Sequence, residues 1–382
     1  MSASPLQRLA SERRVLVVAG AGGVGKTTVA AALGLAAAAR GLNVLCLTVD
    51  PAKRLLDRLG VDGSDVAEQV LDPTRFEAAG IHVKGRLSVS MLDTKRTFDD
   101  LVRRHASSPE VAQRILANEF YEYVSSQLAG TQAYMAMEKV LSVLEERRYD
   151  LVVLDTPPTS DALDFLDAPE RLIETLDSAA LRWLRDAFER SGRLGLNWMA
   201  RGVSLVLRGI ARLTGRRFLE RLAEFVGELN ELFGGFKERA ERVARAFRGP
   251  EFAYLLVATP VSESLDEARF FAERLARTGM RADGLIVNRV RAEIGAAPAL
   301  SSLRARLAQL GFSASPDLAE RVLRAREDEA QLVASERGSL AAARASGSAL
   351  AAERIPLTLE LPAFPASVHD VAALVSVCRH LM

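Results

Sequence analysis

The residues best suited to chemistry lie in one short stretch near the start of the chain. Within the sequence GAGGVGKTT, residues Gly20, Gly25, Lys26 and Thr27 fit the spacing G-x-x-x-x-G-K-[ST]. Glycines let successive backbone N–H groups turn inward around phosphate oxygens, at the positive end of the following helix. The lysine places a cation on the β- and γ-phosphates, and the threonine hydroxyl ligates Mg²⁺. The pattern predicts a phosphate-binding loop whose contacts come from Gly20, Gly22, Gly23, Val24, Gly25, Lys26, Thr27 and Thr28.

Two other interpretations of this stretch are weaker. Gly20, Gly22 and Gly25 also spell G-x-G-x-x-G, the dinucleotide-binding fingerprint, with Asp50 in the place of its ribose-binding acid. A dinucleotide site has no use for Lys-Thr directly after the last glycine, so this interpretation is disfavoured. A glycine turn without a ligand is disfavoured as well, because burying Lys26 without an anion would be costly.

A second chemical residue ends a buried strand. Residues Leu151–Leu154 are apolar and Asp155 follows them, before the prolines Pro157 and Pro158. In a parallel sheet this position brings the carboxylate to the edge that carries the phosphate loop, where it can hold Mg²⁺ through a water. The alternative is an aspartate that caps a loop.

A third candidate, Asp50, ends the strand predicted at Val44–Val49. Its short carboxylate can orient or deprotonate the water that attacks the γ-phosphate. Asp50 followed by Pro51 is also a common helix start, here before Ala52–Leu59. The two roles are compatible, and spacing alone leaves the catalytic one open.

The elements that must position these residues alternate between strand and helix. Apolar runs predict strands at Val15–Ala19, Val44–Val49, Leu87–Met91, Leu151–Leu154, Phe252–Ala258, Leu285–Val287 and Leu357–Leu361. This alternation is typical of an α/β doubly wound, mostly parallel sheet. The long helical gaps predict insertions at 93–147 and 168–249, within a single P-loop domain of residues 1–382.

Composition limits the classes of protein that remain. The 382 residues are 49% hydrophobic with a net charge of +1, so no overall field favours nucleic acid as a partner. Two cysteines without metal-ligand spacing, Cys46 and Cys378, fit a reducing compartment. Residues 1–14 lack an apolar signal segment, and we expect a cytoplasmic protein.

Four segments together resemble a known family. GGVGKTT, VDPA, LDTPPT and Val287-Asn288-Arg289 are similar to the arsenite-pump ATPases and the tail-anchored-protein targeting ATPases. AGTQAYMAMEKV and the ending LPAFPASVHDVAAL most resemble bacterial members described as anion-transporting ATPases. These proteins are dimeric P-loop NTPases with a deviant phosphate loop, and the resemblance covers most of the chain.

The resemblance implies an ATP-hydrolysing, Mg²⁺-dependent homodimer that opens and closes with its nucleotide. Asp50 would be the water-activating residue of switch I, and Asp155 the switch II carboxylate. Asn288 would recognise adenine, with backbone contacts from Pro362 to Pro365.

One residue departs from the family pattern. The signature lysine that follows the first glycine of the loop, and reaches the partner's phosphates, is Ala21 here. Slow hydrolysis, a lysine-bearing paralogue in a heterodimer, or another cation are the possible consequences. Lys53 and Arg54 are candidates for that cation; the alternative is two solvated charges on a helix. The family's metalloid-binding and zinc-binding cysteines are missing too, which disfavours an arsenite site.

The insertions are where a client would bind. An apolar stripe runs through Phe218, Leu222, Phe225, Leu229, Leu232 and Phe236, and a looser set surrounds Trp183 and Trp198. Met135 and Met137 lie in the other insertion. Helix packing explains most of these residues; the sharper hypothesis is a groove for a hydrophobic segment. Residues 182–217 hold nine arginines against two acids, which suggests contact with an anionic membrane surface or an acidic partner.

Three functions follow from the sequence. The first is an ATPase that binds and delivers a hydrophobic, membrane-protein-like client, at the membrane periphery when its arginines engage lipid. The second is the energising subunit of an anion transporter. The third is a positioning ATPase of the chromosome or division-site type, which the long insertion after Asp155 disfavours.

Overall fold

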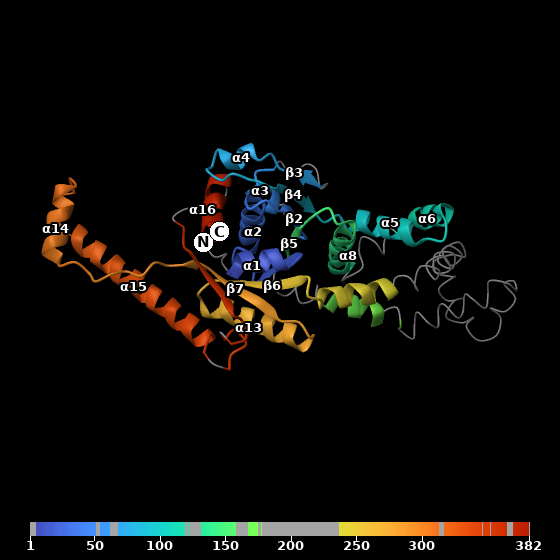
Figure 1. Cartoon of the computed structure of the whole chain (residues 1–382). Coiled ribbons are helices and arrows are strands. Elements are labelled where there is room, and N and C mark those ends of the chain that lie inside the picture. Colours follow the sequence, from blue (N-terminus) through green and yellow to red (C-terminus); the bar gives the residue numbers. More distant parts are fainter. Residues whose placement is uncertain are drawn as a thin grey trace, which may run out of the picture.

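One twisted sheet organises the molecule (Figure 1). The structure is a computed structural model, which describes residues 5–50, 54–61, 68–118, 121, 131–157, 167–174, 177, 237–312, 317–345, 347–351, 353–364 and 370–381. Its strands are β1 (Val15–Gly20), β2 (Asn43–Thr48), β3 (Gln69–Val70), β4 (Arg86–Met91), β5 (Leu151–Asp155), β6 (Phe252–Ala258), β7 (Ala282–Val290) and β8 (Leu357–Pro362).

The described strands form a sheet of eight in the order β3-β4-β2-β5-β1-β6-β7-β8. All neighbours pair in parallel except β3, which is antiparallel to β4. Strand β1 lies inside the sheet, and the chain crosses β5 to reach β2 and later turns back to β6. The edge where the strand order reverses is the place where open α/β sheets bind ligands.

Side chains alternate between the two faces of the sheet, and each face has its own core. One face packs on α1 (Pro5–Glu12), α2 (Lys26–Ala39), α3 (Arg54–Arg58), α4 (Thr74–Glu77) and α16 (Val371–Leu381). The other face packs on α5 (Thr94–His105), α6 (Pro109–Leu116), α8 (Thr131–Glu146), α13 (Ser262–Arg277) and helical residues 237–247. Strands β1 and β6 are buried throughout because helices cover both faces.

All seven predicted strands are present, and the doubly wound α/β prediction is confirmed. Strand β3 was not predicted, and it is only two residues long. The helix expected at Ala52–Leu59 is described from Arg54 to Arg58, and residues 51–53 lie outside the described part of the chain.

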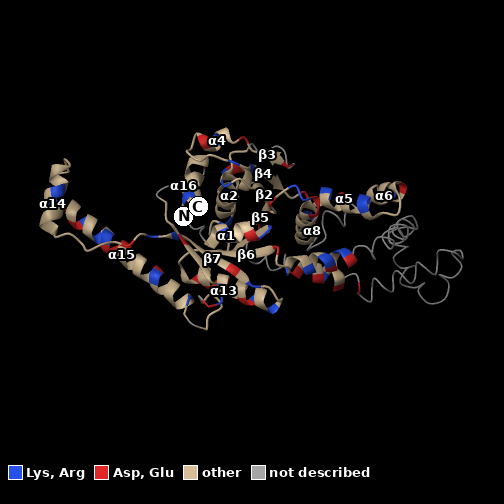
Figure 2. Ribbon diagram, viewed as in Figure 1, with Lys and Arg blue, Asp and Glu red and all other residues tan. Residues whose placement is uncertain are grey.

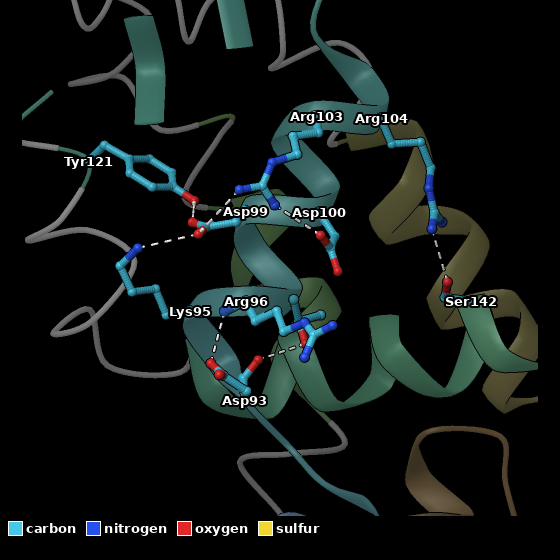
Figure 3. Close-up of polar contacts among 10 residues, drawn as sticks. Asp93, Lys95, Arg96, Asp99, Asp100, Arg103, Arg104, Tyr121 and Ser142 are labelled. Atoms are coloured by element: carbon cyan, nitrogen blue, oxygen red, sulfur yellow. Dashed lines mark hydrogen bonds and ion pairs between the residues drawn. The ribbon is translucent and has the colours of Figure 1, made fainter. Parts of the chain in front are cut away.

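The predicted insertion after β4 is partly described. Asp93 caps the start of α5, and its side chain accepts the backbone N–H of Arg96 at 2.8 Å (Figure 3). Asp99 accepts the Tyr121 hydroxyl at 2.6 Å, and Arg104 donates to Ser142 Oγ at 3.2 Å, which joins α5 to α8. Capping and cross-helix bonds thus fix this helical unit at the end of the sheet.

Met135 and Met137 on α8 are both 1% exposed and belong to the core. They pack as core side chains and add nothing to a surface groove. The apolar stripe from Phe218 to Phe236, the tryptophans and the arginine-rich segment 182–217 lie outside the described residues.

A long helical arm leaves the body of the molecule between β7 and β8. Helix α14 (Leu300–Gln309) contributes no buried residue, and α15 (Leu318–Ala343) returns to the sheet, where it packs on α13 (Figure 1). Charges of both signs follow one another along α15 (Figure 2). None of the described helices is both long enough and apolar enough to cross a membrane.

Candidate functional site

The loop between β1 and α2 lies where the strand order reverses, and glycine is required at both of its ends. Gly20 has φ +154°, and a Cβ there would lie 2.1 Å from the Val257 carbonyl oxygen on β6. Gly25 has φ +102°, and its Cβ would lie 2.3 Å from Asn288 Nδ2. The two glycines therefore allow the loop to fit closely between β6 and β7.

The middle of the loop faces open space instead. A Cβ on Gly22 or Gly23 would meet no atom within 4 Å, and Gly23 has φ +75°. Helix α2 begins with no side-chain cap at Gly25 and no acidic residue in its first turn. Since the first N–H groups of a helix have no partner within it, this uncapped end is well suited to bind an anion.

Lys26 opens α2 and is 7% exposed. Its Nζ donates to the Ala21 carbonyl at 2.8 Å, which holds the ammonium over the loop. Burial lowers the pKa of Lys26, while the nearby charges of Asp155 and Asp50 act in the opposite direction. The lysine is thus a buried cation with carboxylates within electrostatic range.

Asp155, the last residue of β5, is fully buried. Its pKa is raised to about 6, because burial outweighs the hydrogen bonds from Thr27 and Thr48 and the charge of Lys26, which act in the opposite direction. Its Oδ2 accepts the Thr48 hydroxyl at 3.1 Å, whereas its Oδ1 has no hydrogen-bond partner in the described structure. A buried carboxylate oxygen without a partner is expensive unless a cation or water completes the site.

Thr48 connects the two aspartates, a role that the sequence analysis missed. Its hydroxyl donates to Asp155 Oδ2 and accepts the backbone N–H of Asp50, both at 3.1 Å. The backbone supports the same link, because the Val49 N–H donates to the Asp155 carbonyl at 3.2 Å. A hydroxyl residue two positions before Asp50, at the end of a buried strand, was the available signal.

Asp50 is partly exposed and forms an ion pair with Arg54, with 3.4 Å between Oδ2 and Nη1. Arg54 is one turn further along the chain, and its side chain is 63% exposed. It is the described member of the predicted cation pair; Lys53 lies outside the described residues. The structure therefore brings Asp50, Lys26 and Asp155 together at the carboxyl ends of β1, β2 and β5.

Asn288 reaches the same loop from β7. Its Nδ2 donates to the Val24 carbonyl at 2.8 Å, and its Oδ1 accepts the N–H of Arg289 at 3.0 Å. Pro362 ends β8 beside it, paired in register with Val290. Asn288, expected at the base of the nucleotide, thus borders the phosphate loop, and Pro365 lies outside the described part.

The residues present fit Mg²⁺ and a triphosphate. Hard oxygen donors are what Mg²⁺ prefers, and Thr27 and Asp155 supply a hydroxyl and an unpaired carboxylate oxygen. The open positions at Gly22 and Gly23 leave the loop free to surround phosphate oxygens.

Comparisons with known proteins agree with this geometry. Residues 13–308 match the family model described as anion-transporting ATPase. The chain belongs to the anion-transporting ATPase family. This membership confirms the P-loop α/β fold that the sequence analysis predicted.

Three relatives illustrate the range of the anion-transporting ATPase family. A Halobacterium salinarum protein named arsenical pump-driving ATPase is 32% identical over 41% of this chain and 24% of its own length. An Aspergillus terreus protein, ATPase get3, is 28% identical over 45% of this chain and 48% of its own. A Trypanosoma cruzi protein, ATPase ASNA1 homolog, is 25% identical over 76% of this chain and 78% of its own. The chain thus spans half or less of the first two relatives.

Proposed function

We propose that this protein is an ATP-hydrolysing, dimeric switch whose nucleotide state controls the binding and delivery of a hydrophobic, membrane-protein-like client. The observation that carries the catalytic part is the unpaired, buried Oδ1 of Asp155 beside the uncapped start of α2. A cation site and an anion site next to each other are what a magnesium nucleotide requires.

Each site residue has a role in this proposal. The backbone from Gly22 to Thr28 surrounds the phosphates, and Lys26 neutralises the charge that develops on them. Thr27 and Asp155 would hold Mg²⁺, which would polarise the phosphoryl oxygens. Asp50 orients the attacking water, and Thr48 positions its backbone. Asn288 and Pro362 border the base.

The dimeric and client-binding parts of the proposal rest on the family resemblance and on the sequence of the insertions. The family resemblance implies a dimer, and the signature lysine that would act across it is replaced by Ala21, whose side chain is buried. Arg54 is our candidate for the missing charge, since its guanidinium already lies against Asp50. A heterodimer with a lysine-bearing paralogue is the other solution.

An energising role in anion transport is the second candidate, because one relative bears the name of an arsenical pump-driving ATPase. Metalloid chemistry itself fits poorly. Cys46 and Cys378 are buried, and burial raises the pKa of each thiol to about 12. Metal and metalloid ligation requires the thiolate, which these two positions disfavour.

The test combines turnover with mass in solution. We expect the wild type to hydrolyse ATP, Lys26→Ala to lose at least about 100-fold in rate, and the control Lys84→Ala, an exposed lysine, to keep the wild-type rate. An ATP analogue is expected to shift the mass toward a dimer, and ADP to a lesser extent. Absence of turnover with magnesium would contradict the ATPase proposal; a monomer with full turnover would contradict the dimeric switch.

The client is tested separately. A peptide of about 20 apolar residues, fluorescently labelled, is expected to bind in one nucleotide state and be released in the other. A scrambled peptide of equal length with interspersed charges is the control. Equal binding in both nucleotide states would remove the delivery role and favour the transport subunit.

A further inference from the structure

The end of β7 departs from regular pairing with β8 at two residues. Strands β7 and β8 are in register through Val287 and Glu360, and resume at Val290 and Pro362 with a shift in between. Asn288 and Arg289 occupy the irregular step. Arg289 has φ 64°, a left-handed conformation that costs a non-glycine residue about 1 kcal/mol. Irregularities of this kind redirect side chains beside active sites.

The phosphate loop holds this step in place. The amide nitrogen of Asn288 donates to the Val24 carbonyl at 2.8 Å, and its amide oxygen accepts the Arg289 N–H at 3.0 Å. Gly25 leaves the space for that amide, since a Cβ there would lie 2.3 Å from Nδ2. Arg289 is therefore fixed one residue from a side chain that contacts the loop.

The charge of Arg289 is not neutralised within the described structure. Its side chain is exposed, and among the described residues its guanidinium has no hydrogen bond or ion pair. Its charge acts instead on another arginine, Arg58 of α3. Burial lowers the pKa of Arg58, and the charges of Arg54 and Arg289 lower it further, against the opposite effect of Asp57.

Two distant segments thus bring Arg54 and Arg289 within electrostatic range of Arg58, and Arg54 also acts on Lys26. Arg54 has an acidic partner in Asp50, and Arg58 has its neighbour Asp57. Like charges held together repel, and such an arrangement is stable where an anion joins them. The adjacent loop binds phosphate in the proposed function, so the anion at hand is the nucleotide's phosphate chain.

We propose that Arg289, presented by the irregular end of β7, binds the phosphate chain of the nucleotide and so discriminates among nucleotides by phosphate number. The proposal rests on the proposed function of the loop. A charge-assisted bond from a guanidinium to phosphate is directional and strong. Arg58, which lies within electrostatic range of Arg289, adds a second cation to it.

The experiment compares affinities for ATP, ADP and AMP by calorimetry, at fixed magnesium and at two salt concentrations. For Arg289→Ala we expect about a tenfold loss for ATP, a smaller loss for ADP and little change for AMP. The salt dependence of ATP binding is expected to become less steep. Arg289→Lys is expected to keep part of the affinity, and the exposed Arg306→Ala on α14 is the matched control.

A second variant separates the loss of the guanidinium charge from any effect of the substitution on folding. Arg289→Gly removes the guanidinium and also the strain at φ 64°, so we expect the same affinity loss with an equal or higher unfolding temperature. Equal losses for all three nucleotides would place Arg289 on the base or ribose and overturn the proposal, as would unchanged affinities. If the wild type binds no nucleotide, the proposed function itself fails. If Lys26→Ala weakens ATP binding and Arg289→Ala does not, only the role of Arg289 fails.

Discussion

Two buried carboxylates differ in whether the protein supplies partners for both of their oxygens. One lies at the edge of the sheet and the other lies at the base of the helical insertions. Asp155 at the end of β5 keeps one oxygen without a partner, and burial raises its pKa to about 6. Glu138 on α8 is 2% exposed, but Arg239 donates Nε to both of its oxygens, at 2.8 and 3.0 Å. The same guanidinium continues to Glu145, at 2.8 and 3.0 Å.

The difference separates a ligand site from a structural connection. Around Glu138 the protein supplies every partner itself, so α8 and residues 237–247 are joined without help from outside. Around Asp155 the chain supplies the hydroxyls of Thr27 and Thr48 and the charge of Lys26, and it leaves Oδ1 without a partner in the described structure. The unpaired oxygen of a buried carboxylate, more than its burial, therefore distinguishes the proposed ligand site at Asp155 from the structural connection at Glu138.

The largest effect on stability is expected at the satisfied region. Arg239→Ala leaves the Glu138 carboxylate buried without a cation, which costs roughly 3–5 kcal/mol in the free energy of unfolding. Urea unfolding followed by circular dichroism measures it. Arg242→Ala, whose side chain is 62% exposed at 3.3 Å from Glu145, is the control and should change the free energy by less than ~1 kcal/mol. A small loss for Arg239→Ala would mean that water reaches Glu138.

The pH dependence of stability is expected to distinguish Asp155. Its pKa is near 3.8 in the unfolded chain and about 6 in the folded one, so the folded state binds the proton more tightly. Stability in the absence of nucleotide and metal should fall as pH rises from about 4 to 6 and stay level above, by up to ~3 kcal/mol.

Asp155→Asn removes this titration and serves as the comparison. The difference in unfolding free energy between wild type and variant should grow in favour of the variant over the same pH range. Equal pH profiles would show that Asp155 is solvated and that the contrast with Glu138 does not hold.

A smaller effect is expected at Thr48, which supplies Asp155 with its one short hydrogen bond from β2. Thr48→Val keeps the shape and removes the hydroxyl, at a cost of ~1–2 kcal/mol at pH 7.5. ATP turnover should also fall several-fold, because the Asp50 backbone loses its acceptor. Thr48→Ser is expected to restore both. Loss of stability with unchanged turnover would limit Thr48 to a structural role.

The smallest change in stability is expected at Arg54. Its ion pair with Asp50 is exposed, so Arg54→Ala should cost ~0.5 kcal/mol or less. If its charge replaces the missing signature lysine, the double variant Lys53→Ala/Arg54→Ala should nevertheless lose turnover several-fold. Unchanged turnover would remove these residues as the substitute cation.

Sequence reasoning identified the strands and the loop because consecutive residues determine both. Apolar runs such as Leu151–Leu154 can be read locally, and the glycine-lysine-threonine pattern has few other uses. The contact of Asn288 with Val24 and the link through Thr48 join residues that are 264 and 107 positions apart. No local pattern encodes such contacts, and the two-residue strand β3 is too short to stand out.

The arm between β7 and β8 makes the stability of this chain uneven. Because α14 buries none of its residues, opening it exposes little apolar surface that was protected before. Amide hydrogens there should exchange with solvent after local opening alone, whereas those of β1 wait for the whole sheet to unfold. The same contrast places the first cuts of a protease in α14, while α15 stays attached where it packs on α13.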